Sequence, residues 1–307
     1  MNNETTLKTV VDAAAQVDLG MTHFDAHKFD DALSAFEQAI VLDPNCAPAW
    51  NGIGRVNYHI GTPEAAIAAY ERAIASDPNF DHAYYGIGIL LAVKVGNYPE
   101  AIAAFRRGLA ANPNESYLAN AIYSTYARMG RFDEAITGLE QSLANNPSDT
   151  FALSWLGTIY LHQKRYDDVI AAYQREISIE EAHSPHRIIG LVYDHLGNHT
   201  LAITHLERAV ALEPQDYEAR AALAVVYRAT SRNVEADAQD ALADEMAKQD
   251  EEYGQACVQA LRGNVDEAVR LLAIALPKKL VMPGWACIDP EFAFVKDDPR
   301  FKALVGE

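Results

Sequence analysis

The sequence predicts an all-α solenoid, in which antiparallel helix pairs stack one upon the next, and three periodic features support this fold class. Prolines recur with spacings of 34, 35, 34 and 67 residues, at Pro44, Pro78, Pro113, Pro147 and Pro214. Glycines keep the same period, at Gly20, Gly54, Gly88, Gly157 and Gly190. Small residues do so as well, each followed four positions later by a large apolar residue, as in Ala32 and Phe36. A period near 34 residues indicates units that must stack because none can bury its apolar face alone.

The first half of one unit, residues 47–80, predicts a helix and a turn. Trp50, Ile53 and Gly54 lie at helical spacing and therefore share one face. Gly61 permits a tight turn. Pro63 suits the first turn of a following helix, where its missing N–H is not needed.

The second half of the same unit predicts a helix that packs against the first. Gly54 and Ala66 are small where the two helices approach, and Tyr70 fills the space beside them. Asp77 and Pro78 end the second helix, because the residue before a proline is pushed out of the helical region. The unit is therefore an antiparallel helix pair.

These residues resemble the tetratricopeptide repeat signature, W-x2-L-G-x2-Y, then A-x3-F, then P, at a period of 34. The resemblance is carried by Trp50/Ile53/Gly54, Leu156/Gly157/Tyr160, Ile189/Gly190/Tyr193, Ala32/Phe36 and Ala101/Phe105. It implies a right-handed superhelix whose inner surface is lined by the first helix of each pair. It also implies that partner segments lie on that surface.

The pattern extends over residues 1–276 as about eight repeats. We expect them at residues 13–46, 47–80, 81–115, 116–149, 150–182, 183–216, 217–248 and 249–276. Residues 277–307 do not repeat and carry apolar side chains in short segments bounded by Asp-Pro pairs, namely Trp285, Phe292, Phe294, Phe301 and Leu304. Because a solenoid must cover the exposed face of its last repeat, we expect a hydrophobic cap here, with a separate docking motif as the alternative. The segment also resembles the ending of many bacterial tetratricopeptide proteins, so we expect a natural C-terminus.

Three repeats depart from the pattern. Repeat three has one extra residue near Val93–Gly96, which predicts a bulge or a longer turn. Repeat five lacks its closing proline and has Glu176 where a small residue is expected. Repeat seven has Asp240 at an aromatic position and Ser231-Arg232-Asn233 in place of a glycine turn, which leaves open a shift in the register of its second helix.

Composition and charge exclude several classes of protein. The net charge of −18 disfavours binding to nucleic acid, because phosphates would be repelled over most of the surface. The first residues carry no basic stretch followed by an apolar run, and no 18 consecutive residues are apolar. The three cysteines are far apart and odd in number, which argues against a disulfide framework or a zinc site. We therefore expect a cytoplasmic protein that is not inserted in a membrane.

The first helices supply a candidate partner-binding groove. Its expected residues are Asn51, Arg55, Tyr58, His59, His82, Tyr85, Tyr117, Asn120, Arg128, Ser154, Trp155, His162, Arg187, His195 and Arg228. Tyr, Trp, Arg and Asn are common at binding hot spots. Within a strongly acidic chain, these arginines and histidines predict a neutral-to-basic groove. We expect it to take a protein or peptide segment that is acidic or ends in a free carboxylate. Every groove must expose some side chains, so an unselective surface is the competing interpretation.

Other site chemistries find little support. The lysine–asparagine clamp of chaperone-binding members is missing, since Val17, Met21, Tyr85 and Ile89 stand at the corresponding positions. Five histidines cluster in the sequence, but His186 and His195 would lie ~13 Å apart along one helix, so no single ion could use them all. No nucleotide, metal or hydrolase motif is present. We expect no metal, no cofactor and no enzymatic activity.

The favoured hypothesis is a protein–protein interaction scaffold, present as a monomer or weak homodimer. Two alternatives stay open: a regulator that responds to a peptide, and a self-assembling structural protein. Repeat architecture alone cannot identify the partner, because one fold serves unrelated tasks.

Overall fold

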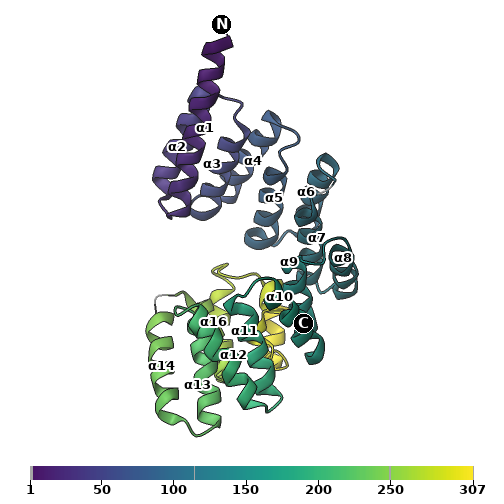
Figure 1. Ribbon diagram of the computed structural model, residues 1–307, viewed down its shortest axis with the longest axis vertical. Coiled ribbons are helices and arrows are strands. Elements are labelled where there is room, and N and C mark those ends of the chain that lie inside the picture. Colours follow the sequence, from purple (N-terminus) through teal and green to yellow (C-terminus); the bar gives the residue numbers. More distant parts are fainter. Residues whose placement is uncertain (1–2, 114, 249, 307) are drawn as a thin grey trace. The chain divides into compact units, whose positions relative to one another are not determined.

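A computed structural model describes residues 3–113, 115–248 and 250–306, and every regular element in these ranges is helical. The chain divides into two compact units, Met1–Thr125 (unit 1) and Tyr126–Glu307 (unit 2). Within each unit, successive helices form antiparallel pairs (Figure 1). The predicted all-α fold of stacked helix pairs is therefore confirmed.

Unit 1 contains the first three pairs and most of α7. Its helices are α1 (Asn3–Asp25), α2 (Phe29–Leu42), α3 (Ala47–Ile60), α4 (Pro63–Ser76), α5 (Asp81–Ile89) with its continuation η1 (Leu90–Val95), α6 (Tyr98–Ala111) and α7 (Ser116–Arg128). The boundary between the units falls within α7.

Unit 2 continues the same alternation and ends in shorter elements. Its further helices are α8 (Phe132–Asn145), α9 (Thr150–His162), α10 (Tyr166–Ile179), α11 (His183–His195), α12 (His199–Leu212), α13 (Tyr217–Ala229), α14 (Asn233–Ala247), α15 (Glu252–Leu261) and α16 (Val265–Ala275). The C-terminal segment, residues 277–307, holds α17 (Pro283–Ala286), η2 (Pro290–Phe292) and α18 (Pro299–Val305).

Glycine allows the helices of neighbouring pairs to approach one aromatic ring from two sides. Phe36 is fully buried between Gly20 of α1 and Gly52 of α3. A Cβ atom would lie 2.6 Å from the Phe36 ring at Gly20 and 2.5 Å from it at Gly52. Interiors are close-packed, so neither position can accept a side chain unless the helices separate.

The closing prolines also accept hydrogen bonds from the next pair. The donors occupy the fourth position of their repeats, and the bonds are Trp50 Nε1 to Pro44 O (3.0 Å), Tyr84 OH to Pro78 O (3.2 Å) and Arg220 Nε to Pro214 O (3.0 Å). Proline thus both ends one helix pair and anchors the next.

Repeat five, which lacks this proline, uses other contacts. His186 stands at the fourth position of repeat six, and its Nδ1 lies 3.0 Å from Nδ1 of His205. Glu176, at the position where a small residue was expected, is buried and accepts a 2.7 Å hydrogen bond from Ser154. A polar contact therefore replaces small-residue packing in this part of unit 2.

The other two departures have local explanations. The extra residue of repeat three is accommodated by π-helical turns at Leu90–Val95, followed by Gly96 in the left-handed region with φ of 75°. The predicted bulge is thus confirmed. In repeat seven, Ala236 is fully buried at its expected position, so the register of α14 is kept. Asp240 instead pairs with Arg262 at 2.8 Å.

Candidate functional site

Unit 1 has a cavity of about 350 Å³ on the surface formed by α1, α3 and α5. Its lining comprises Phe24, Asn51, Arg55, Tyr58, His59, Tyr70, His82, Tyr85, Gly86 and Ile89. The predicted groove residues of repeats two and three, from Asn51 to Tyr85, all lie here. A cavity of this size, largely aromatic with a few polar groups, is typical of a ligand-binding site. We refer to it as the unit 1 pocket.

Arg55 is the cationic group of the unit 1 pocket. Its guanidinium lies 4.2 Å from the centre of the Phe24 ring and 3.2 Å from Sδ of Met21. Among the residues described, no carboxylate forms an ion pair with it. Lys94 Nζ lies 5.2 Å from the Tyr58 ring centre nearby. The pocket therefore keeps a positive charge that the protein itself does not neutralise.

Two histidines shape the rest of the electrostatics. Burial, together with Lys94 and Arg55, lowers the pKa of His59, so this ring is neutral near pH 7. His82 Nδ1 lies 2.9 Å from Oδ1 of Asp81, which also accepts a hydrogen bond from the backbone N–H of His82. Burial works to raise the pKa of Asp81, but hydrogen bonds outweigh it and the pKa is lowered. The carboxylate of Asp81 is therefore already hydrogen-bonded to its own neighbours.

Tyr117 extends the aromatic surface next to the pocket. Its ring centre lies 5.2 Å from that of Tyr85 and 5.8 Å from that of His82.

Asn51 Oδ1 is buried and has no hydrogen-bond donor among the residues described. A buried amide oxygen without a donor costs free energy, so a ligand N–H would be favourable at that point.

Asn120 does not belong to this surface. It was expected to face the groove, but only 2% of it is exposed. Asn120 of α7 is therefore part of the interior of unit 1.

In unit 2 the C-terminal segment lies against α9 and α11, the helices expected to carry the groove there. Lys296 Nζ donates a hydrogen bond to the carbonyl of His162, and Lys164 Nζ lies 2.6 Å from Oδ2 of Asp297. Phe294 stacks on His195 with 4.5 Å between ring centres. The segment, yellow in Figure 1, therefore occupies this surface.

Two tryptophans and an arginine form a second cluster of contacts. The ring centres of Trp155 and Trp285 lie 5.8 Å apart in an edge-to-face arrangement. The Arg128 guanidinium lies 5.3 Å from the Trp155 ring centre and 4.7 Å from that of Trp285. Three predicted groove residues therefore contact the protein's own C-terminal segment. They are Trp155, Arg128 and His195.

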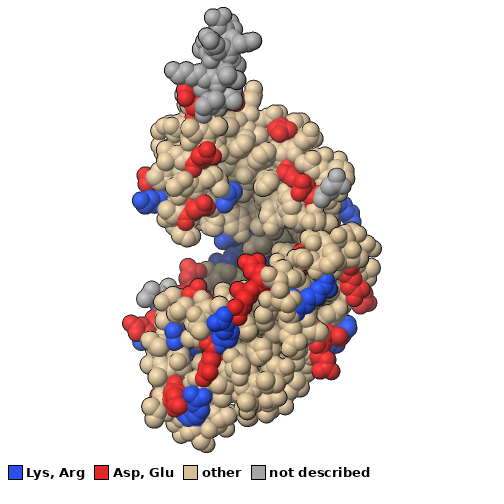
Figure 2. Space-filling model, viewed as in Figure 1, with Lys and Arg blue, Asp and Glu red and all other residues tan. Residues whose placement is uncertain are grey.

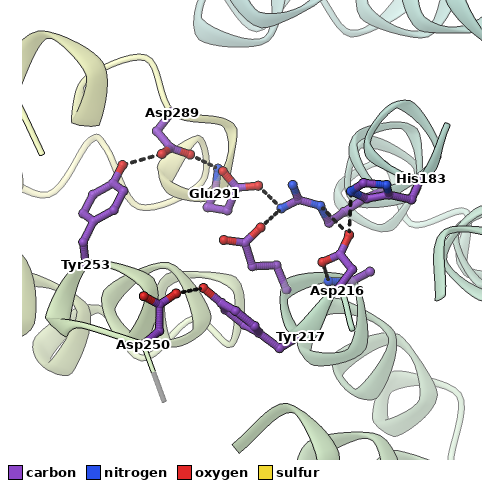
Figure 3. Close-up of polar contacts among 10 residues, drawn as sticks. His183, Asp216, Tyr217, Asp250, Tyr253, Asp289 and Glu291 are labelled. Carbon is purple, nitrogen blue, oxygen red and sulfur yellow. Dashed lines mark hydrogen bonds and ion pairs between the residues drawn. The ribbon is translucent and has the colours of Figure 1, made fainter. Parts of the chain in front are cut away.

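Arg187 is the centre of a buried network of charges, and Figure 3 labels Asp216, Asp289 and Glu291 of this network. Its guanidinium forms ion pairs with Glu291 of the C-terminal segment, with Glu218 at 2.5 Å and with Asp216 at 3.3 Å. Asp289 caps η2 by accepting from the Glu291 N–H at 3.1 Å. The sequence analysis predicted that Arg187 would bind a carboxylate of a partner. In the structure, Arg187 binds carboxylates of this chain instead.

Burial and mutual repulsion set the protonation of this network. Burial, followed by the neighbouring acids, raises the pKa of Glu218 to about 8, although Arg187 opposes the shift. Burial and Glu291 raise the pKa of Asp289 as well. For Glu291 burial also acts to raise the pKa, but Arg187 and the hydrogen bonds from Asp289 and the backbone together outweigh it, and the pKa is lowered. One arginine thus stands in a cluster in which Glu218, with a pKa of about 8, holds a proton near pH 7.

Other predicted residues in unit 2 are also occupied. Ser154 donates to Glu176 at 2.7 Å. Arg228 lies 3.1 Å from Asp237 and also pairs with Asp240, beside a cavity of about 380 Å³. These positions are not available to bind a partner carboxylate without first losing an internal contact.

The sequence pattern did not assign two residues of the unit 1 pocket, Phe24 and Tyr70, to the groove. Phe24 was not assigned to the groove, although it follows Gly20 by four positions, as Tyr58 follows Gly54. Tyr70 was assigned only to the core, yet it also lines the unit 1 pocket. The contacts of the C-terminal segment with α9 and α11 gave no periodic signal, because the segment does not repeat.

The visible surface has acidic and basic side chains interspersed over unit 2 (Figure 2). In the described part of the chain, no group of three or more His, Cys, Asp or Glu side chains is arranged to hold a metal ion. A search of the described helices found none with the length and apolar character needed to cross a membrane.

Similar solved structures share this fold. A tetratricopeptide repeat protein from Parabacteroides merdae is 13% identical, with a TM-score of 0.59 over 82% of this chain and 98% of that one. PilW, described as a type IV pilus biogenesis factor, is 20% identical, with a TM-score of 0.56 over 66% and 94%. Pseudomonas aeruginosa pilF is 17% identical, with a TM-score of 0.55 over 67% and 94%. At such identities the likeness concerns the fold.

Sequence comparison with family models gives the family. One tetratricopeptide repeat model matches residues 17–80, 124–184 and 189–251, and a second matches residues 61–122. No curated protein matches the sequence. Because the matched ranges cover most of the chain, this protein belongs to the tetratricopeptide repeat family.

Proposed function

We propose that this protein is a non-enzymatic interaction scaffold whose unit 1 pocket binds a segment of another protein. The observation that carries the proposal is the contrast between Arg55 and Arg187, which is the buried arginine among the predicted groove residues of unit 2. Arg55 has no carboxylate partner among the described residues, whereas Arg187 has three carboxylates of its own chain. A half-buried arginine in an aromatic cavity favours a ligand that supplies a carboxylate.

The rest of the pocket defines the ligand further. Tyr58, Tyr85 and Phe24 offer ring faces for an apolar or aromatic side chain. The buried oxygen of Asn51 would accept a backbone N–H of an extended segment. We therefore expect an acidic segment, or a chain end with its free carboxylate, that carries an apolar residue next to the charge.

Two further expectations belong to this proposal. We expect the protein to act in the cytoplasm, in keeping with its small and odd number of cysteines. We also expect a monomer or weak homodimer. Cell fractionation and light scattering test these two expectations.

A selection from a random peptide library, with the intact chain as bait, tests the pocket directly. Selected peptides should carry Asp, Glu or a C-terminal carboxylate beside an apolar residue. In calorimetry, Arg55→Glu should weaken their binding by at least about 10-fold, which corresponds to about 1.4 kcal/mol.

Arg72→Glu is the matched control, because Arg72 lies over Trp50 at 5.0 Å and does not line the pocket. The two variants change the charge of unit 1 equally. Peptides without acidic groups, or equal binding to both variants, would contradict the proposal.

A further inference from the structure

The C-terminal segment has two faces with different roles. One face closes the end of the repeat stack: Phe292 and Phe301 are fully buried in a core cluster with Ala256 and Leu272 of the last helix pair. The other face contacts α9 and α11, several repeats earlier in the chain. Phe294 belongs to this second face and remains 37% exposed.

The contacts of the second face are those of a bound ligand. Phe294 stacks on His195, Trp285 packs against Trp155, and Glu291 pairs with Arg187. The links of the segment to α9 and α11 named above all involve side chains. The segment is therefore held there by several separate side-chain anchors, in the way that a peptide is held by pockets for alternate side chains.

Buried charge makes this docking costly as well as specific. Glu291 and Arg187 are both desolvated, with Glu218 and Asp216 beside them. Burying an ion pair loses much of its Coulombic gain to desolvation, so such a contact contributes more to specificity than to affinity. A ligand that displaces the segment must therefore supply an equivalent carboxylate for Arg187.

We propose that the surface of α9 and α11 is a second segment-binding site, and that residues 285–297 are its built-in, exchangeable occupant. The expected partner presents the same chemistry: an aromatic ring, a carboxylate six residues later and a second ring three residues after that, as in Trp285, Glu291 and Phe294. This inference is independent of the unit 1 pocket. A tethered occupant acts at a high effective concentration, so partner binding is suppressed until the segment is displaced.

A fluorescent peptide with the sequence of residues 282–298, carrying Cys287→Ser, tests the proposal in the full-length protein. Trp285→Ala together with Phe294→Ala weakens the anchoring of the segment but keeps Phe292 and Phe301 in the cap. The peptide should bind this double variant at least about 10-fold more tightly than it binds the unaltered chain. Adding Trp155→Ala and His195→Ala on the receiving surface should abolish that gain.

Hydrogen exchange supplies the second measurement. In the unaltered chain, an excess of peptide should accelerate exchange in residues 285–297. Phe292 lies within this segment and is fully buried against the last helix pair, so exchange in α15 and α16 should accelerate together with it. A peptide of scrambled sequence should have no effect. Equal binding to both proteins would place the peptide elsewhere and overturn the proposal. If the peptide did not bind the double variant, the proposal would be overturned as well, whatever the hydrogen-exchange rate of the variant's own segment.

Discussion

Units 1 and 2 use the same repeat, yet one exposes its aromatic and cationic side chains and the other covers them. In unit 1, Arg55 and His59 border an open cavity of about 350 Å³. In unit 2, Arg187 is buried and pairs with Glu291, and His195 is stacked against Phe294. Position within a repeat therefore predicts which surface a residue belongs to. It does not predict whether that surface is available.

The comparison is tested most strongly by removing each arginine. Arg187→Met leaves buried carboxylates without their cation, so we expect a loss of about 3–5 kcal/mol in the free energy of unfolding. Arg55→Met removes no ion pair, and we expect a loss below about 1 kcal/mol. Urea unfolding of both variants measures the two losses in the free energy of unfolding. Hydrogen exchange then shows which helices are destabilised. Equal losses would mean that the two arginines do not differ as described.

The two faces of the C-terminal segment offer the next test. Phe292→Ala opens a cavity in a fully buried site and should cost about 3–5 kcal/mol. Phe294→Ala removes a partly exposed ring stacked on His195 and should cost about 1 kcal/mol. Thermal unfolding of the two single variants measures this difference. A larger loss at Phe294 would mean that the contact with α11, and not the cap, holds the segment in place.

A pH titration distinguishes the buried network of unit 2 from the rest of the molecule. The pKa of Glu218 rises from an ordinary value of 4.5 to about 8 on folding, so the folded protein binds one more proton between those values. Stability contributed by this group is therefore present at low pH and is lost as pH rises towards 8, by at most about 1.4 kcal/mol per pH unit. The facing charges are those of Arg187, Glu291, Asp216 and Asp250.

Glu218→Gln is the control for that titration, because the amide stays neutral at every pH. After correction for intrinsic base-catalysed exchange, protection in η2 and α13 should fall between pH 6 and 8 in the unaltered protein, and this loss of protection should shrink in the variant. An identical pH profile for both proteins would assign the titration to another group.

The sequence was sufficient for the fold because each helix pair repeats the same local rules. Small residues such as Gly54 and Ala66, large ones such as Tyr70 and closing prolines such as Pro78 recur with the period of the unit. The π-helical insertion near Gly96 was also visible as one extra residue. These features depend on neighbours that are close in the chain.

The candidate site was predictable only in part, since it depends on contacts between distant residues. The residues of the unit 1 pocket follow from helical position, so Asn51, Tyr58 and Tyr85 were found. The contact of Arg187 with Glu291 joins residues 104 positions apart in the chain. Nothing in a 34-residue period encodes where a non-repeating segment folds back.

The smallest effect we expect concerns the fifth position of the repeat, which Asn51 occupies in unit 1 and Ser154 in unit 2. Ser154 donates to the buried Glu176, and burial already raises the pKa of that carboxyl, so Ser154→Ala should cost about 1 kcal/mol. Asn51→Ala removes an oxygen that has no donor among the described residues, so the stability should change by less than about 0.5 kcal/mol.

The same pair of variants separates stability from binding. Peptides selected on the unit 1 pocket should lose about 5-fold in affinity for Asn51→Ala, because one hydrogen bond of about 1 kcal/mol disappears, and should bind Ser154→Ala unchanged. Calorimetry and thermal unfolding of both proteins measure the two effects. If Asn51→Ala were as destabilising as Ser154→Ala and bound peptides normally, Asn51 would be a structural residue. The availability of its oxygen would then not distinguish the two units.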